Sequence, residues 1–290
     1  MRCACIDIGS NTTALLVADA GDDGLRLLGT RRVFTLLGSS LKDGQIDAGK
    51  IEEVCDAVKL FVEYARRLGA ERISVVATHV LREVKDSSVL VQVIERHCGL
   101  PVRVLTTAEE AQYSFTGAVG GRTVPGRATI VVDAGGGSTE VTWSGSGGEL
   151  SDLRTKSFAI GSSSLRRGFL HSDPPTAEEL AAARAFADET FAALDVPAAC
   201  GIALAVGGGA TTAREIVGGL IDERSVARVL ELTTSLDSEQ LANRLEIEWQ
   251  RARLLPAGLI VLVAASARLG LPLEVGLGGL REGVIHELLA

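Results

Sequence analysis

Two carboxylates flank a run of three glycines in the segment TIVVDAGGGSTEVTWS, residues 129–144. Asp133 ends one apolar run, and Glu140 lies at the start of the next. Both flanks are β-prone, so the segment predicts a hairpin with the glycines at its tip. Backbone amides at such a tip can form a nest that binds an anion, and carboxylate oxygens are the ligands that Mg²⁺ prefers. The pattern indicates phosphate chemistry with a metal ion, although a plain flexible turn would use the same glycines.

A second segment repeats this order near the start of the chain. In RCACIDIGSNTTALLVADA, residues 2–20, Asp7 closes an apolar run before a turn of small polar residues. Asp7 is therefore a candidate metal ligand together with Asp133 and Glu140. Two similar hairpins opening two halves of a chain predict two similar domains that face each other.

A third glycine run lies in IALAVGGGATTAREIV, residues 202–217. It has the order strand, Gly207-Gly208-Gly209, helix, and a helix N-terminus offers free amides and the positive end of a dipole. The run lacks the GK[ST] ending of a P-loop and the spacing of GxGxxG. A tight strand-to-helix turn explains it as well as an anion site does. Together with the two hairpins, it could line one cleft.

The composition excludes some classes of partner. The net charge is −8, from 29 basic and 37 acidic residues, which argues against nonspecific nucleic-acid binding. The five cysteines are odd in number and form no CxxC, so neither a disulfide framework nor a zinc site is expected. Cys3 and Cys5 lie two apart on a predicted strand, and we expect both on one buried face.

Nothing in the sequence predicts a membrane protein. The first strand begins almost at residue 1, which leaves no room for a signal peptide. The longest apolar run, LLPAGLIVLVAASA, contains a proline, is too short to span a bilayer and stops at Arg268. We expect a cytoplasmic protein with neither a membrane nor a nucleic acid as partner.

The rest of the chain alternates strands with helices, which predicts α/β sheets with helical cover. Helix 48–68 has an apolar stripe at helical spacing, and Asp47 is its expected cap. Further helices are expected at 86–97, from 107, and at 177–194, 210–218, 237–250, 257–268 and 281–289. Strands are expected at 72–81, 101–106, 152–159 and 201–206, besides the two hairpins.

Six segments occur in the order seen in a known family. They are ACIDIGSNTTALLVAD, ATHVLRE, TAEEAQYSFTGAV, IVVDAGGGSTEV, AVGGGATTAREI and GGLREGVIHELL. The chain resembles the exopolyphosphatase/guanosine pentaphosphate phosphatase family, in its short two-domain class, within the actin, hexokinase and heat-shock-70 fold group. The resemblance implies an α/β fold with two similar actin-like, ribonuclease H-like domains across a cleft. The domains would be 1–123 and 124–280, and a last helix at 281–290 could pack back on the first.

The resemblance also assigns roles to residues. Asp133 and Glu140 would hold Mg²⁺ or Mn²⁺, Glu110 matches the family's proposed general base, and Arg82 matches an arginine near the phosphate channel. The expected phosphate-binding residues are Ser10, Asn11 and Thr12 on the first loop, Gly135, Gly136, Gly137, Ser138 and Thr139 on the second, and Gly207, Gly208 and Gly209 on the third.

Glu110 also has a structural interpretation. Thr107-x-x-Glu110 has the form of a capping box, in which the glutamate accepts from the amide of its own N-cap residue. The same letters, TAEE, recur at 176–179 without any sign of chemistry. From the letters alone the cap is the preferred reading, whereas the resemblance favours the base. Both roles are compatible if Glu109 forms the box with Thr106.

The chain departs from the family pattern at two places, and both departures bear on which substrate it binds rather than on the type of reaction. Where the family often has Arg-Leu-Gly-x-Gly-Leu, this chain has LLGSSL, with Leu36 in the place of the arginine. The segment that resembles Arg-Ala-Asp-x-x-x-Pro-Gly reads RARLLPAG, with Arg253 in the place of the acid.

The main expectation is a Mg²⁺-dependent phosphoanhydride hydrolase that removes the terminal phosphate from inorganic polyphosphate or guanosine pentaphosphate. One alternative is a kinase of the same fold group, which would also need places for an acceptor and adenosine. Another is a nonenzymatic sensor of a phosphorylated alarmone, which the missing arginine favours and the carboxylates oppose. The chain could form a homodimer.

Overall fold

The computed structural model describes residues 1–21, 24–120, 122–124, 126–145, 152–195 and 199–290. The chain forms two compact units: unit 1 comprises Met1–Gly120 with Gly278–Ala290, and unit 2 comprises Gly121–Leu277. The first break therefore falls at Gly120, where the sequence led us to expect it after residue 123. The C-terminal helix belongs to unit 1.

Unit 1 is built on one mixed sheet in the order β3-β2-β1-β4-β5. The first three strands form an antiparallel meander, whereas β4 and β5 run parallel to β1. The strands are β1 (Arg2–Ile8), β2 (Thr13–Gly21), β3 (Gly24–Val33), β4 (Arg72–Ala77) and β5 (Val102–Val104). The helices are α1 (Leu37–Ser40), α2 (Ala48–Arg67), α3 (His79–Glu83), α4 (Ser87–Cys98), α5 (Thr107–Val119) and α12 (Leu280–Leu289).

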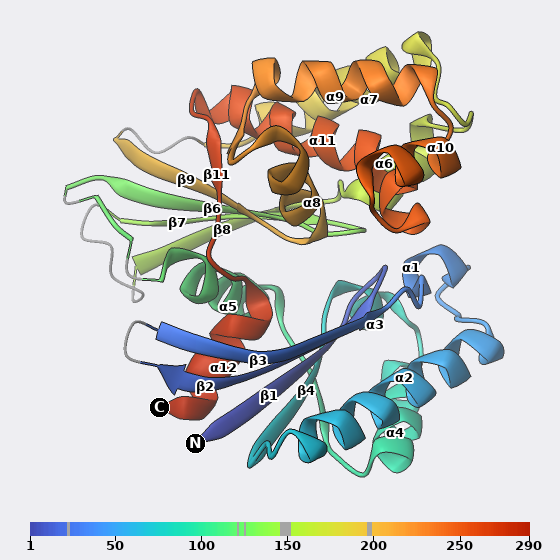
Figure 1. Ribbon diagram of the computed structural model, residues 1–290, viewed down its shortest axis with the longest axis vertical. Helices are drawn as coiled ribbons and strands as arrows, with labels where there is room; N and C mark the ends of the chain where they lie inside the picture. Colours follow the sequence, from blue (N-terminus) through green and yellow to red (C-terminus); the bar gives the residue numbers. More distant parts are fainter. Residues whose placement is uncertain (22–23, 121, 125, 146–151, 196–198) are drawn as a thin grey trace. The chain divides into compact units, whose positions relative to one another are not determined.

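Alternate residues of β1 point to opposite sides of this sheet, and helices cover both sides. Ala4 and Ile6 join a core with α2 and α4. Cys3 and Cys5 join a second core with α5 and α12, and Figure 1 shows these two helices side by side. The expectation that both cysteines share one buried face is confirmed. The Asp47 carboxylate accepts from the Gly49 amide and caps α2, as expected.

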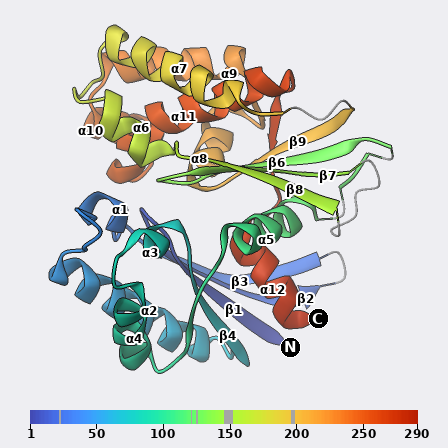
Figure 2. The same ribbon diagram turned by 180° about the vertical axis from the view of Figure 1, so that it is seen from behind.

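Unit 2 is built on a mixed sheet in the order β10-β11-β9-β6-β7-β8. Its strands are β6 (Ala128–Ala134), β7 (Thr139–Ser144), β8 (Leu153–Phe158), β9 (Cys200–Val206), β10 (Leu220–Ile221) and β11 (Leu273–Val275). Its helices are α6 (Ser162–Phe169), α7 (Ala177–Ala192), α8 (Gly208–Val217), α9 (Glu223–Ser235), α10 (Ser238–Leu245) and α11 (Trp249–Leu269). In both views, α7, α9 and α11 lie on the same face of this sheet (Figure 2).

The two sheets share one topology. In each, a three-stranded antiparallel meander comes first, namely β1–β3 in unit 1 and β6–β8 in unit 2. A parallel strand, β4 or β9, then pairs with the first strand of the meander, and β5 or β11 pairs parallel with that strand in turn. The prediction of two similar α/β domains is confirmed.

Some predicted elements were wrong in extent. The helix expected at 237–250 ends at Leu245, and α11 begins at Trp249 and runs through Pro256, where a later start was expected. The strand expected at 72–81 ends at Ala77, and the short helix α3 follows it. The elements α6, α9 and β3 were not anticipated.

Helix α11 is the single helix of the described residues that is long and apolar enough to cross a membrane by composition. However, 78% of its most apolar window is buried inside the structure. Leu259, Ile260 and Val261 along it belong to the core of unit 2. This burial is typical of a core helix.

Candidate functional site

The predicted glycine hairpin is present in unit 2. Strands β6 and β7 pair antiparallel, and residues 135–138 form the loop between them. The amide of Gly135 donates to the carbonyl of Ser138 at 3.0 Å, which closes the tip. The tip is therefore a defined turn rather than a loose connection.

Helix α6 binds the carbonyl groups of this loop. The Ser162 amide donates to the Gly135 carbonyl at 3.0 Å, and the amides of Ser163 and Ser164 donate to the Gly136 carbonyl at 2.8 and 3.0 Å. The Ser164 hydroxyl also lies 3.2 Å from the carbonyl oxygen of Gly137. With its carbonyls satisfied from one side, the loop has a fixed orientation.

The amides of the loop remain available to a ligand. Across the described part of the chain, Gly136 and Gly137 donate no backbone hydrogen bond to the protein. Thr139 differs from the expectation, because its buried hydroxyl donates to the Ile160 carbonyl at 2.6 Å. Its hydroxyl therefore stabilises the hairpin in this structure and does not point to a phosphate. The Ser138 side chain is also buried, with 4% of the residue exposed.

The two carboxylates beside this loop face the same way. Asp133 and Glu140 are directly opposite each other in the β6–β7 ladder. Opposite residues in an antiparallel pair place their side chains on one face of the sheet. Glu140 is 3% exposed, and its Oε1 accepts from the Ser157 hydroxyl at 2.7 Å, which fixes its orientation.

This pair fits the chemistry of a Mg²⁺ site. Magnesium is usually held by one or two carboxylates, with water and substrate phosphates completing its shell. Asp133 and Glu140 supply two hard oxygen ligands on one face, beside amides that suit an anion. Among the described residues there is no group of three His, Cys, Asp or Glu side chains that could enclose a metal without a substrate.

The third glycine loop lies at the same edge of this sheet. Strand β9 pairs parallel with β6, with Val206 opposite Asp133, so the loops that follow both strands emerge together. Gly207 has φ 95° and caps α8. A Cβ there would lie 2.6 Å from the Ala134 carbonyl oxygen and 3.2 Å from Oδ1 of Asp133. Glycine is therefore required both by conformation and by the approach of β6.

Arg251 is a residue of this region that the sequence reasoning missed. Its Nη1 donates to the Gly208 carbonyl at 3.2 Å and also to the Thr212 hydroxyl. Its Nε pairs with Glu248 at 3.1 Å, and 14% of its side chain is exposed. It holds the first turn of α8 in place, as α6 holds the second loop. The arginine at the start of RARLLPAG was the available signal.

In unit 1, the first hairpin has a tip of the same form. The Gly9 amide donates to the Thr12 carbonyl at 2.9 Å, as Gly135 does to Ser138 in unit 2. The carbonyls of Ser10 and Asn11 accept from the amides of Gly38 and Leu36, at 2.7 and 2.9 Å. The backbone of the LLGSSL segment therefore braces the first loop although Leu36 stands where the family often has arginine.

Asp7 differs from Asp133 in its surroundings. Asp7 lies opposite Ala14 in the β1–β2 ladder, whereas Asp133 lies opposite Glu140. The first hairpin thus offers one carboxylate where the second offers two. Of the three predicted metal ligands, the structure brings together Asp133 and Glu140.

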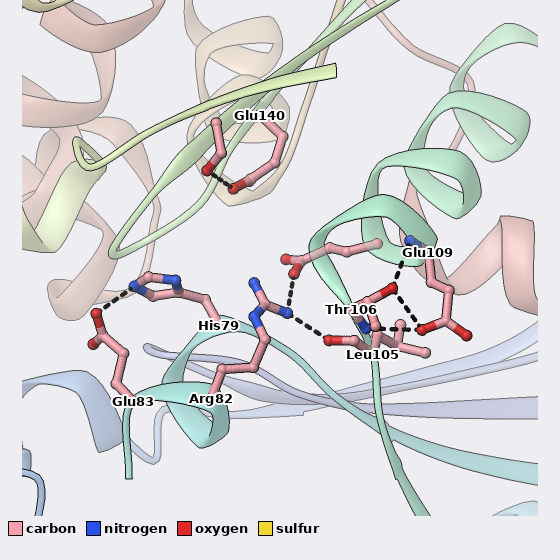
Figure 3. A network of polar contacts seen from close by, with 9 residues as sticks. His79, Arg82, Glu83, Leu105, Thr106, Glu109 and Glu140 are labelled. Carbon is pink, nitrogen blue, oxygen red and sulfur yellow. Dashed lines mark hydrogen bonds and ion pairs between the residues drawn. The ribbon is translucent and has the colours of Figure 1, made fainter. Parts of the chain in front are cut away.

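The cap interpretation of Glu110 was wrong. Helix α5 is capped by Thr106, and Glu109 completes the box through its bond from the Thr106 amide at 2.8 Å (Figure 3). Glu110 is 8% exposed, and its Oε2 accepts instead from Nη1 of Arg82 at 2.7 Å. The box at Thr176 uses Glu179, so the two TAEE segments are capped one residue out of step.

Arg82 lies in the last turn of α3 rather than directly after a strand. Its Nη1 donates to the carbonyl of Leu105 at 2.7 Å as well as to Glu110 (Figure 3). Within the described residues, its Nε and Nη2 groups make no hydrogen bond. A guanidinium has five N–H donors, so Arg82 can hold Glu110 and still meet an oxyanion.

Two other titratable groups lie near the Arg82–Glu110 pair, namely Glu109 and His79, and the pKa of each is shifted by its own surroundings. A hydrogen bond from Arg103, with further bonds from Thr106, lowers the pKa of Glu109 to about 2. Burial lowers the pKa of His79. The carboxylate of Glu83, 3.2 Å from the imidazole, raises this pKa, whereas the charge of Arg82 lowers it, and the net shift is downward. Glu109 is committed to the helix cap, and His79 is predominantly neutral near pH 7.

The chain is similar to known proteins. The chain matches the Ppx/GppA phosphatase family over residues 16–290. Exopolyphosphatase 2 of Mycobacterium tuberculosis is 36% identical over 195 residues, which cover 63% of this chain and 59% of that protein. The chain thus matches less than two thirds of the length of this curated relative.

Solved structures are similar over the full length. A Ppx/GppA family member from Aquifex aeolicus is 28% identical, with a TM-score of 0.81 over 100% of this chain and 98% of that one. An exopolyphosphatase from Cytophaga hutchinsonii, 20% identical, shares the fold with a TM-score of 0.84 over 100% and 98% of the two chains. The chain belongs to the Ppx/GppA phosphatase family.

Proposed function

We propose that this member of the Ppx/GppA phosphatase family hydrolyses phosphoanhydrides and removes the terminal phosphate from inorganic polyphosphate or guanosine pentaphosphate. The family match and the curated exopolyphosphatase relative support this reaction class. Location in the cytoplasm and dimerisation stay predictions from the sequence.

Each unit contributes different chemistry in this proposal. In unit 2, the amides of Gly136 and Gly137 and the N-terminal turn of α8 hold phosphate oxygens. Asp133 and Glu140 would hold Mg²⁺, which when bound would neutralise the charge of the non-bridging oxygens. In unit 1, Glu110 orients a water molecule and accepts its proton as the water attacks phosphorus. Catalysis of phosphoryl transfer consists mainly of such positioning and charge stabilisation.

The observation that carries the proposal is the Arg82–Glu110 pair. Glu109 already completes the capping box of α5, so Glu110 is not needed as a cap. Glu110 is instead buried, and it bonds to the guanidinium of Arg82 at 2.7 Å. Among the described residues, Nε and Nη2 of Arg82 have no acceptor, so they can bind one supplied by a ligand. A carboxylate held beside a spare oxyanion donor suits the hydrolysis of a phosphoanhydride, because one group can accept a proton from water and the other can bind a phosphate oxygen.

A substrate panel tests the proposal. Purified protein with Mg²⁺ is incubated with tripolyphosphate, long-chain polyphosphate, guanosine pentaphosphate and ATP, without any phosphoryl acceptor, and released inorganic phosphate is measured. We expect release from at least one of the first three substrates and little from ATP. A kinase would release little phosphate and would transfer the phosphoryl group to an acceptor once one is added, and a sensor would bind a ligand without releasing any phosphate. Either result would exclude hydrolysis as the function.

A further inference from the structure

Unit 2 has a pocket that the proposed reaction does not use. It opens among α6, the segment that follows α6, α9, α10 and α11, and two arginines line it, Arg166 of α6 and Arg253 of α11. Asp173, Thr233 and Ser238 supply further polar groups, beside apolar side chains such as Leu170. We call it the Arg166–Arg253 pocket.

Within the part of the chain that the structure describes, neither arginine has a carboxylate bound to it. Among the described residues, the Arg166 guanidinium makes no hydrogen bond or ion pair, and Arg253 makes one charge contact, over the Trp249 ring at 5.1 Å from its centroid. The carboxylate that lines the pocket is engaged elsewhere, because both oxygens of Asp173 accept from Ser238, at 2.8 and 2.7 Å.

The second carboxylate nearby is engaged as well. Glu179 accepts from the amides of His171 and Ser172 through Oε1, and from the amide of Thr176 through Oε2, each at 3.0 Å. Glu179 and Asp173 still act on Arg166 through their charge, but neither bonds to it. The donors of Arg166 and Arg253 are therefore available to a ligand.

Placing two like charges together in a half-buried pocket has an electrostatic cost. Burial lowers the pKa of Arg166, and the positive charge of Arg253 lowers it further. An oxyanion bound to both guanidiniums would remove this repulsion and would accept hydrogen bonds in the geometry that guanidinium groups favour. The pocket thus has the charge and donors for a phosphate group.

Two helices connect this pocket with the phosphate loops of unit 2. Arg166 is four residues beyond Ser162, whose amide binds the second loop, so the two lie about 6 Å apart along α6 at 1.5 Å per residue. Arg253 is five residues before Gly258 on α11, about 7.5 Å by the same measure. A Cβ built at Gly258 would lie 3.7 Å from the Cα of Gly209 and 3.8 Å from the Cβ of Ser162. The pocket is about one helical turn from both loops.

We propose that the Arg166–Arg253 pocket is a second oxyanion subsite of unit 2, which takes a phosphate group of a polyphosphate chain or free inorganic phosphate. Its identity as a polyphosphate subsite rests on the proposed function, whereas its binding of phosphate does not. Arg253 stands where the resembling family segment has an acid, and an acid at this position would cancel the charge of Arg166. The subsite is therefore a feature of this chain rather than of the family pattern.

Calorimetric titration with inorganic phosphate at constant ionic strength tests the site without turnover. The variants are Arg166→Gln and Arg253→Gln, and the control is Arg167→Gln, which removes an exposed arginine of α6 that does not line the pocket. We expect one class of sites to weaken by at least about tenfold in each pocket variant and not in the control. Equal affinity and stoichiometry in all four proteins, with melting temperatures that show them folded, would overturn the proposal.

A local reporter makes the assignment specific. Trp249 is one of two tryptophans and lies beneath Arg253, so Trp143→Phe leaves a single tryptophan, next to an arginine of the pocket. Its emission should change in a saturable manner with inorganic phosphate, and adding Arg166→Gln should abolish that change. A response that survives Arg166→Gln would contradict the site.

Kinetics with two substrate lengths identify the source of the phosphate. If a chain phosphate occupies the pocket, Arg166→Gln raises KM for long polyphosphate by about tenfold and leaves tripolyphosphate unchanged. If released phosphate occupies it, both KM values stay constant and inhibition by inorganic phosphate weakens. Absence of all hydrolysis would refute the proposed function alone, because the titration still decides on the pocket.

Discussion

Glu109 and Glu110 are adjacent in the sequence, yet their carboxylates have different partners. Glu109 bonds to Thr106 and Arg103, both near the exposed start of α5. Glu110 faces Arg82 and is 8% exposed. A helix turns by about 100° per residue, so neighbouring side chains point in different directions. This offset allows Glu109 to cap the helix while Glu110 pairs with Arg82.

The pair provides a matched test of the general base. Glu110→Gln should remain folded and bind tripolyphosphate, but it should turn over at least roughly a hundredfold more slowly, because an amide cannot accept the proton of water. Glu109→Gln is the control, since glutamine can still close a capping box. Initial rates of phosphate release decide the matter, and similar rates for the two variants would remove Glu110 from the proposed mechanism.

The metal assignment has its own internal comparison. Asp133→Asn and Glu140→Gln each remove one of two carboxylates that share a face, and each should raise the Mg²⁺ concentration needed for half-maximal activity by at least about tenfold. Asp7→Asn changes a carboxylate that lies opposite an alanine, so it should have a smaller effect on this concentration. Direct titration of Mg²⁺ by calorimetry, with triphosphate present, checks the same order of effects. An equal loss of metal binding in Asp7→Asn would contradict the assignment of the metal to Asp133 and Glu140.

At the scale of elements, helix α6 and the second loop are joined by backbone hydrogen bonds. Gly161 precedes the helix in extended conformation, and a Cβ there would lie 2.6 Å from the carbonyl carbon of Gly136. Gly168, near the other end of the same helix, has nothing within 4 Å of such a Cβ. The two glycines therefore differ in what an added methyl group would meet.

We expect Gly161→Ala to displace α6 from the loop and to weaken binding of tripolyphosphate by at least about tenfold. Gly168→Ala should bind normally and melt at an equal or higher temperature, because alanine favours the helix by roughly 0.5–1 kcal/mol. Calorimetric titration and thermal melts of both variants test this. Normal binding by Gly161→Ala would mean that the loop does not depend on α6 for its shape.

The sequence predicted the elements whose signals are local. The two hairpins, the cap at Asp47 and the stripe of α2 follow from strand propensity, turn residues and helical spacing, and the structure contains all of them. The pairing of Asp133 with Glu140 was also predictable, because two residues equally far from a hairpin tip lie opposite each other. The register of the cap at α5 was not, since Thr106 and Thr107 offer the helix two starts with the same letters.

Elements stabilised by distant contacts were harder to predict. Strand β3 lies at the sheet edge and is mostly exposed, so it lacks a clear apolar alternation. Pro256 normally interrupts a helix at a cost of about 3 kcal/mol, yet α11 continues through it because Pro256, Ala257 and Gly258 are buried in the core of unit 2. The partner of Arg82 depends on how α3 packs near α5, which the sequence alone did not specify.

At the scale of the whole molecule, one plan occurs twice with different chemistry. Both units have a hairpin tip closed by the same type of hydrogen bond, from the first loop residue to the fourth. The second copy has Glu140 where the first has Ala14, and it has a third glycine loop at the same sheet edge. The first copy has instead the Arg82–Glu110 pair. In the proposed function, a duplicated fold would carry a phosphate- and metal-binding half and a half that acts on water.

The chain must also return to unit 1 to complete it. Helix α12, at the C-terminal end, packs against α5 through glycines, because a Cβ on Gly283 would overlap the carbonyl of Tyr113 and one on Gly117 would overlap that of Gly279. Val284 and Ile285 fill the core with Cys3 and Cys5. Closure of unit 1 therefore requires two helix backbones to approach each other more closely than alanine allows.

This contact predicts a destabilisation confined to one unit. Gly283→Ala should destabilise unit 1 by roughly 1–3 kcal/mol, since neither backbone can yield to the new methyl group without a shift of α12. The exposed Glu287→Gln is the control on the same helix, because glutamine can still accept from Tyr113 and the substitution removes only an ion pair with Arg103, at 3.3 Å, which lies at the surface and contributes little. Both tryptophans, Trp143 and Trp249, lie in unit 2, so their fluorescence reports that unit alone, whereas circular dichroism reports both.

In guanidinium unfolding, Gly283→Ala should lower the midpoint seen by circular dichroism and leave the tryptophan midpoint near that of the parent protein. Midpoints equal to the parent by both methods would mean that α12 is dispensable for unit 1, and the close glycine contact would then have no structural role.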